Sequence, residues 1–231
     1  MTGRSSLAAK DPEERRRRIL AAAVEVLKEK GFAGARIADV AAAAGTSPAL
    51  VVYHFKTLDG ALAEAVGSVE DDFYDDLERL LPPRATALER LRLIGELGSD
   101  TGPAVGNWAL WMEVWVRALR DSQARALRRA LDARWRQTLR EVIDAGVAEG
   151  TFTCADPQAT AVRLAALMDG LAVQVSLHDP DVPEQRMTGL WLEAAAAELG
   201  VAVDDVLGRR RRSARARTPA AGRPTGRRPT R

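Results

Sequence analysis

The chain has 231 residues, of which 46% are hydrophobic, so it can bury a sizeable core and is globular rather than disordered. No run of about 18 apolar residues occurs, which argues against a membrane span, and the N-terminal sequence lacks the apolar core of a signal peptide. The single cysteine, Cys154, excludes an intramolecular disulfide and a cysteine-based metal cluster. We therefore expect a cytoplasmic protein that does not contact a membrane.

The net charge of +2 hides a strong partition along the chain. Residues 1–58 carry a net charge of +4, residues 59–207 carry −12, and residues 208–231 carry +10 with no acidic residue. A basic head and a basic tail thus flank an acidic body. A polyanion such as DNA is expected to meet the two ends.

The first predicted helix follows a flexible arm, residues 1–10. Asp11 is a good N-cap, with proline at the first helical position and Glu14 three residues on as a capping-box partner. The helix should end at Gly31, and its inward face consists of Ile19, Ala23, Val26 and Leu27. Residues 15–18 are four arginines that go round all faces of a helix, so some are solvated while one or two could reach phosphate.

Two short helices with a sharp turn between them are predicted over residues 36–55. Gly45 ends the first, because glycine enters a left-handed C-cap without a Cβ penalty. Ser47 is a good N-cap, and Pro48 stands where a new helix begins. The second helix is too short to be stable alone and must be held by its neighbours. The spacing fits a helix-turn-helix DNA reader or an ordinary helical hairpin.

The rest of the chain reads as further amphipathic helices, over residues 59–80, 85–98, 108–119, 122–149, 158–177 and 183–199. No strand pattern occurs, so the predicted fold is all-α with about nine helices. The acidic run from Glu70 to Asp76 reads as a solvated face. Residues 208–231 contain arginine, proline, alanine, glycine and threonine with almost nothing to bury, which predicts disorder.

The order of these elements, with Ala44-Gly45-Thr46-Ser47 at the turn and Val52-Tyr53-His54-Phe55 at the close, resembles the TetR family of bacterial transcriptional regulators. The resemblance covers residues 12–62. The later half is similar to the family's BetI-type regulatory domain, on the segments Trp111 to Ala118, Gly146 to Phe152 and Asp169 to Leu171. The resemblance implies an N-terminal three-helix DNA-binding domain at residues 11–58 and a ligand-binding and dimerisation domain at residues 59–207.

Three positions depart from the family pattern. Arg36 stands where a threonine usually caps the first short helix and touches phosphate, so that cap is lost although a guanidinium can still contact phosphate. Val52 replaces a frequent tyrosine, and Leu58 replaces a frequent lysine. These changes affect the details of the backbone contacts to DNA.

The candidate DNA-binding residues lie on and around the second short helix. Its apolar side chains suit thymine methyl groups, and its polar ones suit phosphate. It carries no arginine, asparagine or glutamine for bidentate base contacts, so DNA shape is expected to carry part of the specificity. The predicted contacts are Arg36, Thr46, Ser47, Pro48, Ala49, Leu50, Tyr53, His54 and Lys56.

One monomer reads too little DNA for useful affinity, so a homodimer on a palindromic site is expected. The resemblance places the interface on the last two helices, where small and apolar residues recur. A core within one chain is the alternative for the same residues. The interface candidates are Met168, Leu171, Val175, Leu190, Trp191, Ala194 and Ala195.

The body should hold a pocket for a small-molecule effector, although tryptophans at this spacing also suit a plain core. Aromatic side chains beside carboxylates would suit a cationic ligand through cation–π contact. The candidate walls and polar anchors are Phe73, Trp108, Trp111, Met112, Glu113, Trp115 and Asp169.

The sequence thus predicts a ligand-responsive transcriptional regulator, a repressor in the family's usual mode, with no cofactor and no metal. A non-specific architectural DNA binder driven by the arginine-rich tail is the alternative. A helical metalloenzyme using carboxylates such as Glu70 and Asp71 is disfavoured, because neither histidine has a glutamate three residues upstream. His54 has no acid or nucleophile placed beside it for catalysis.

Overall fold

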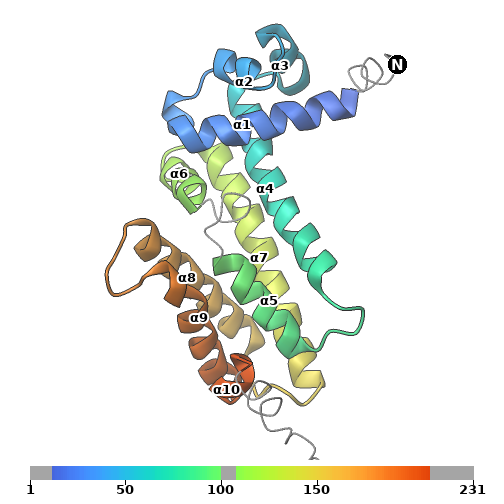
Figure 1. Ribbon diagram of the computed structural model, residues 1–231, viewed down its shortest axis with the longest axis vertical. Coiled ribbons are helices and arrows are strands. Elements are labelled where there is room, and N and C mark those ends of the chain that lie inside the picture. Colours follow the sequence, from blue (N-terminus) through green and yellow to red (C-terminus); the bar gives the residue numbers. More distant parts are fainter. Residues whose placement is uncertain (1–11, 100–107, 209–231) are drawn as a thin grey trace, which may run out of the picture.

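The computed structural model describes residues 12–99 and 108–208, and this part of the chain is built from helices without a strand. The N-terminal helices lie at one end of an elongated molecule, and the C-terminal helices lie at the other (Figure 1). The helices are α1 (Pro12–Gly34), α2 (Ile37–Ala43), α3 (Pro48–Phe55), α4 (Leu58–Leu80), α5 (Ala87–Ser99), α6 (Trp108–Ala118), α7 (Ser122–Ala148), α8 (Pro157–Ser176), α9 (Glu184–Leu199) and α10 (Val203–Val206). The all-α prediction is confirmed.

The turn between α2 and α3 forms as the sequence predicts. Gly45 adopts a φ of 60°, and the Ser47 hydroxyl accepts a hydrogen bond of 3.3 Å from the backbone N–H of Leu50. Pro48 occupies the first position of α3. Val51 and Phe55 are buried, so packing from neighbouring helices holds this two-turn helix in place.

The start of α2 lacks the family's usual threonine cap, and another hydrogen bond stabilises it instead. Arg36 is the N-cap residue, and a guanidinium cannot accept the hydrogen bond that a threonine hydroxyl would accept. The carboxylate of Asp39 instead accepts from the backbone N–H of Arg36 at 3.0 Å and pairs with the ammonium of Lys30 at 2.8 Å. This hydrogen bond from Lys30 lowers the pKa of Asp39. The Arg36 side chain stays exposed.

Two hydrophobic cores divide the described chain. The first, near the helix-turn-helix, contains the buried face of α1, the N-terminal half of α4 and two residues of α6, Leu110 and Val114. The four residues predicted to face inward from α1 are all buried there. The second core lies among α5, α7, α8 and α9, around the fully buried Trp191. Helices α4, α6 and α7 contribute to the walls of both regions, so they connect the two ends of the molecule.

Two local features differ from the sequence predictions. Gly31 leaves helical geometry with a φ of 64° as predicted, but the chain then makes one further helical turn to Gly34. A one-turn helix, α10, follows α9 and brings the described helices to ten, where about nine were expected. The predicted cap Asp11, the arm and all of the tail beyond Gly208 lie outside the described residues.

Glu70 also differs from expectation, because it does not belong to a solvated face. It is only 8% exposed and lies on the side of α4 that carries the buried residues Val66 and Leu77. None of the described helices has the length and apolar character needed to cross a membrane.

Candidate DNA-binding surface and effector pocket

The outer face of α3 and the turn before it form an exposed surface at the N-terminal end of the molecule. Ser47, Pro48, Ala49 and Lys56 are exposed, and Tyr53 has 78% of its surface free. Thr46, Leu50 and His54 are partly buried. The predicted contact residues from Thr46 to Lys56 thus lie on α3 and its flanks, and Arg36 is exposed at the start of α2.

His54 lies against its aromatic neighbours rather than beside a catalytic partner. Its ring meets Tyr53 edge to face at 5.3 Å between centroids and is 6.1 Å from the ring of Phe55. Its Nε2 atom is buried and has no hydrogen-bond partner among the described residues. Within the part of the chain that the structure describes, the Nε2 atom thus has no carboxylate or hydroxyl with which to share a proton.

The arginines of α1 mainly hold the helix-turn-helix together. Arg16 pairs with Glu64 of α4 and lies 5.3 Å from the ring centre of Phe55. Arg18 donates a hydrogen bond of 3.1 Å to the carbonyl of Ala44, at the C-terminal end of α2. Arg17 pairs with Glu14 one turn earlier at 2.6 Å. Arg16 and Arg18 therefore fix α1 against α2, α3 and α4, whereas the Arg17 pair lies within α1.

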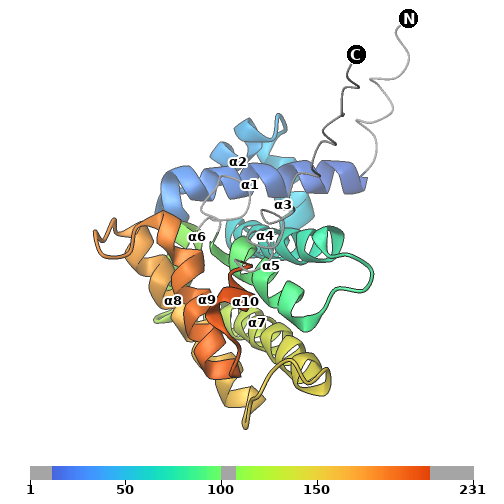
Figure 2. The ribbon, with the colours of Figure 1, turned by 60° about the horizontal axis from the view of Figure 1, so that its bottom comes forward.

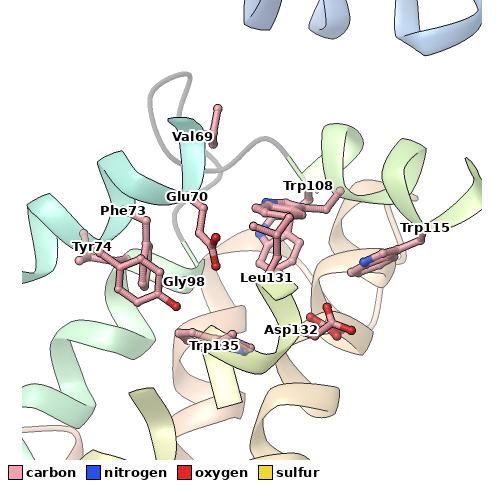
Figure 3. Close-up of a pocket in the computed structure, with 13 residues that line it drawn as sticks. Val69, Glu70, Phe73, Tyr74, Gly98, Trp108, Trp115, Leu131, Asp132 and Trp135 are labelled. Carbon is pink, nitrogen blue, oxygen red and sulfur yellow. The ribbon is translucent and has the colours of Figure 1, made fainter. Parts of the chain in front are cut away.

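A cavity of about 100 Å³ lies between the two cores, among α4, α5, α6, α7 and α8 (Figure 3). Aromatic rings and carboxyl groups form most of its wall. Its lining is Val69, Glu70, Phe73, Tyr74, Leu97, Gly98, Trp108, Trp111, Trp115, Leu131, Asp132, Trp135 and Asp169.

Four of the chain's five tryptophans thus face one cavity. The rings of Phe73 and Trp135 meet edge to face at 5.7 Å, and Phe73 meets Tyr74 in the same way at 5.2 Å. Figure 3 shows Glu70 directed into the space between these rings and Trp108, with Asp132 and Trp115 on the other side.

Two of the three carboxyl groups in the cavity are poorly compensated. Burial raises the pKa of Glu70 to about 7, and the Arg134 guanidinium, 3.7 Å away, opposes only part of that effect. Burial, reinforced by the nearby carboxylate of Asp132, raises the pKa of Asp169 to about 6. Asp132 itself pairs with Arg128 at 3.2 Å and Arg136 at 3.8 Å. A cation that entered the cavity would relieve the cost of ionising Glu70 and Asp169.

Five of the seven predicted pocket residues line this cavity, and Met112 and Glu113 do not. Glu113 is exposed on another face of α6, where its carboxylate accepts a 3.4 Å hydrogen bond from the backbone N–H of Phe32. Its prediction as a polar anchor of the pocket is therefore wrong, because the three tryptophans that turn inward from α6 turn Glu113 toward α1.

The sequence prediction missed Glu70, Tyr74, Asp132 and Trp135 as pocket residues. Glu70 shares a helical face with Phe73, which was the available signal. Trp135 lies in the apolar row of α7 with Leu131 and Leu139, but periodicity alone does not separate a cavity wall from a filled core.

Helices α8 and α9 lie side by side along one flank (Figures 1 and 2). Four of the seven predicted interface residues, Met168, Leu171, Trp191 and Ala195, are buried within the chain itself. Packing inside one chain, the alternative that the sequence left open, accounts for these four. Val175, Leu190 and Ala194 are partly buried. The outward face instead includes Val162 and Leu177, which are 44% and 67% exposed.

Comparison with known proteins agrees with both halves of this architecture. Residues 19–65 match the family model described as bacterial regulatory proteins, tetR family, and residues 87–201 match the model described as BetI-type transcriptional repressor, C-terminal. The two matches together span well over half of the chain. The chain belongs to the TetR family. Membership makes it a DNA-binding transcription regulator rather than an enzyme, and the predicted BetI-type regulatory domain is confirmed.

Individual relatives of this TetR-family protein extend the likeness to almost the whole fold. It is 32% identical to a transcriptional regulator from Saccharomonospora viridis whose crystal structure contains choline, with a TM-score of 0.70 and coverage of 78% of this chain and 94% of that one. A TetR-family regulator structure from a Rhodococcus species is 28% identical, with a TM-score of 0.73 over 81% and 99% of the two chains. The transcriptional regulator BetI from Cronobacter sakazakii is 27% identical over 71% of this chain and 80% of that protein.

Proposed function

We propose that this protein is a repressor that binds a palindromic operator as a homodimer through α3 and is released from DNA by a small quaternary ammonium compound. The observation that carries the effector class is the cavity in which four tryptophans, Phe73 and Tyr74 surround two poorly compensated carboxyl groups. Aromatic faces attract a quaternary ammonium group, and each such contact contributes on the order of 0.5–2 kcal/mol. A choline-bound structure of a relative supports the same class.

The reading surface is residues 36–56, with α3 in the major groove and the exposed Tyr53 and Lys56 toward the phosphates. Ser47, Pro48 and Ala49 present only small groups, so we expect contacts to thymine methyl groups and to the backbone. The DNA-binding unit comprises residues 11–58 together with the start of α4, which shares their hydrophobic core.

The dimer interface is the outward face of α8 and α9. Val162 and Leu177 stand out from α8 on this face, on either side of the exposed Ala166 and Gly170. Small residues between apolar ones allow two helix pairs to approach closely. A two-fold pair would set two copies of α3 at a fixed spacing on successive turns of the DNA.

Helix α6 is the element through which the effector acts on the DNA-binding domains. Trp108, Trp111 and Trp115 face the cavity, whereas Leu110 and Val114 pack into the N-terminal core. On the same helix, Arg117 pairs with Asp59 at 2.8 Å and lies 5.2 Å from the ring centre of Phe32. If the cavity binds a cation more tightly with α6 in one position than in another, the cation would favour that position and so change the spacing of the two DNA-binding domains.

The effector class is tested by titrating the protein with choline, tetramethylammonium, octanoate and benzoate while following tryptophan fluorescence. Because four of the five tryptophans line the cavity, occupancy should change the emission directly. Saturable responses to the two ammonium compounds alone would support the proposal. Responses to octanoate or benzoate, with none to the ammonium compounds, would reject it.

DNA recognition is tested by binding the protein to its own upstream DNA across a salt series, with and without residues 209–231. One saturable footprint that survives truncation would identify α3 as the reader. Binding that is indifferent to sequence and lost on truncation would favour the non-specific architectural alternative, whose affinity falls steeply with salt.

A further inference from the structure

Trp108 lines the effector cavity, and its indole N–H is a hydrogen-bond donor that the described residues leave unused. Its Nε1 atom is buried, and no acceptor lies within reach among the described residues. Trp191 offers an internal comparison, because it is fully buried in the second core and its Nε1–H donates to the carbonyl of Leu164 at 2.9 Å. A buried indole that serves packing alone thus has a partner in this protein, and the indole at the cavity has none.

Buried donors without a partner are costly, so most are satisfied in folded proteins, and an exception in a binding cavity points to the ligand. The charged groups of the cavity, Glu70, Asp132 and Asp169, are all carboxyl groups, which suit a cation. Trp108 adds a neutral donor to this set. Figure 3 places its side chain between Glu70 and Trp115, above Trp135, in the central part of the cavity.

We propose that Trp108 donates a hydrogen bond to an uncharged oxygen of the effector, so that the cavity selects an ammonium compound carrying a hydroxyl or carbonyl group. This inference rests on the proposed function and defines the ligand further. The aromatic rings and carboxyl groups hold the ammonium head, while Trp108 distinguishes an oxygen-bearing ammonium compound from a purely alkyl one. Trp108 is thus a specificity-determining residue.

The test compares choline with n-propyltrimethylammonium, in which a methyl group replaces the hydroxyl at nearly the same shape and charge. The affinity of the full-length protein for each is measured by titration calorimetry. We expect choline to bind about tenfold more tightly, since choline alone gains a hydrogen bond to the unpaired donor and a net hydrogen bond contributes about that factor.

The variant Trp108→Phe keeps an aromatic ring and removes the N–H, so it should bring the two affinities to within about twofold of each other. Trp115→Phe is the matched control from the same helix and cavity, and it should weaken both ligands together while preserving their ratio. The unmodified protein alone can refute the proposal even if a variant fails to fold, because the proposal requires a preference for choline there.

The outcomes separate the two proposals. Equal affinities of the unmodified protein for both compounds would overturn the role of Trp108 while leaving the ammonium class intact. Preference for choline that persists in Trp108→Phe would assign the selection to another group. Binding of neither compound would contradict the proposed effector class itself.

Discussion

Replacing Glu70 by glutamine should stabilise the protein at alkaline pH while weakening its affinity for a cationic effector. Glu70 is 8% exposed, and burial raises its pKa from an ordinary 4.5 to about 7. Between those two values the folded protein binds a proton that the unfolded chain has released. The contribution of Glu70 to the free energy of unfolding is therefore fully present at acid pH, and it is lost as the pH rises through the pKa that Glu70 has in the folded protein.

The size of the effect follows from the shift. Each pKa unit corresponds to about 1.36 kcal/mol, so ionising Glu70 in the folded protein costs about 3 kcal/mol once the pH exceeds 7. Most of this cost appears between pH 5 and pH 8. The free energy of unfolding of Glu70→Gln, relative to the unmodified protein, should therefore rise by roughly 2–3 kcal/mol over that interval.

Urea denaturation at pH 5 and pH 8, at one fixed protein concentration, measures this difference. Glu78→Gln is the matched control, because Glu78 lies on the same helix and is exposed. The control should change little at either pH. Parallel pH dependences for Glu70→Gln and the unmodified protein would refute the assignment of a buried, poorly compensated carboxyl group at this position.

Three further predictions follow from the same structure. Choline should bind more tightly at pH 8 than at pH 5.5 by roughly tenfold, because the raised pKa values of Glu70 and Asp169 make the cation displace protons. Calorimetry in buffers of different ionisation enthalpy would show the release of protons on binding, and a choline affinity that does not change with pH would count against the prediction. Tyr53→Ala should weaken operator binding at least about tenfold with a melting temperature unchanged within error, since this side chain is 78% exposed; loss of folding or unaltered DNA affinity would each argue against its role. Leu177→Glu should shift the protein to monomers in sedimentation, because it places a charge on the proposed α8–α9 interface, and an unchanged sedimentation coefficient would move the interface elsewhere.

Much of the fold could be predicted because local chemistry determines where the helices begin and end. Gly45 adopts a left-handed conformation, Ser47 accepts from the N–H of Leu50, and Thr57 accepts from the N–H of Gly60 at 3.0 Å. Gly150, with a φ of 71°, follows the end of α7. Each of these signals acts within four residues, so the sequence alone contains the relevant information.

The site was less predictable because it depends on how the helices are rotated relative to one another. The acidic run after Glu70 suggested a solvated helix face, yet Glu70 itself lies in the buried row with Val66 and Leu77. Glu113 lies between Trp111 and Trp115 in sequence but points toward Phe32 on α1. Hydrophobic periodicity identifies which residues turn inward, but it does not tell whether they meet a core, a cavity or a second chain.

The same ambiguity explains the interface residues. Met168 and Trp191 have the apolar character expected at an interface between chains, and both are fully buried inside one chain. Only the position of α8 against α7 and α9 reveals that Val162 and Leu177 are the apolar residues left facing outward.

The most direct test of the account is the release of DNA by the proposed effector. The protein is bound to a fluorescently labelled fragment of its own upstream DNA, and choline is added while fluorescence anisotropy is followed. We expect a saturable fall in anisotropy with choline, and a shift of that fall to higher choline concentrations in Glu70→Gln. Anisotropy that stays constant at choline concentrations which saturate the tryptophan signal would contradict the link between the cavity and the reading helix.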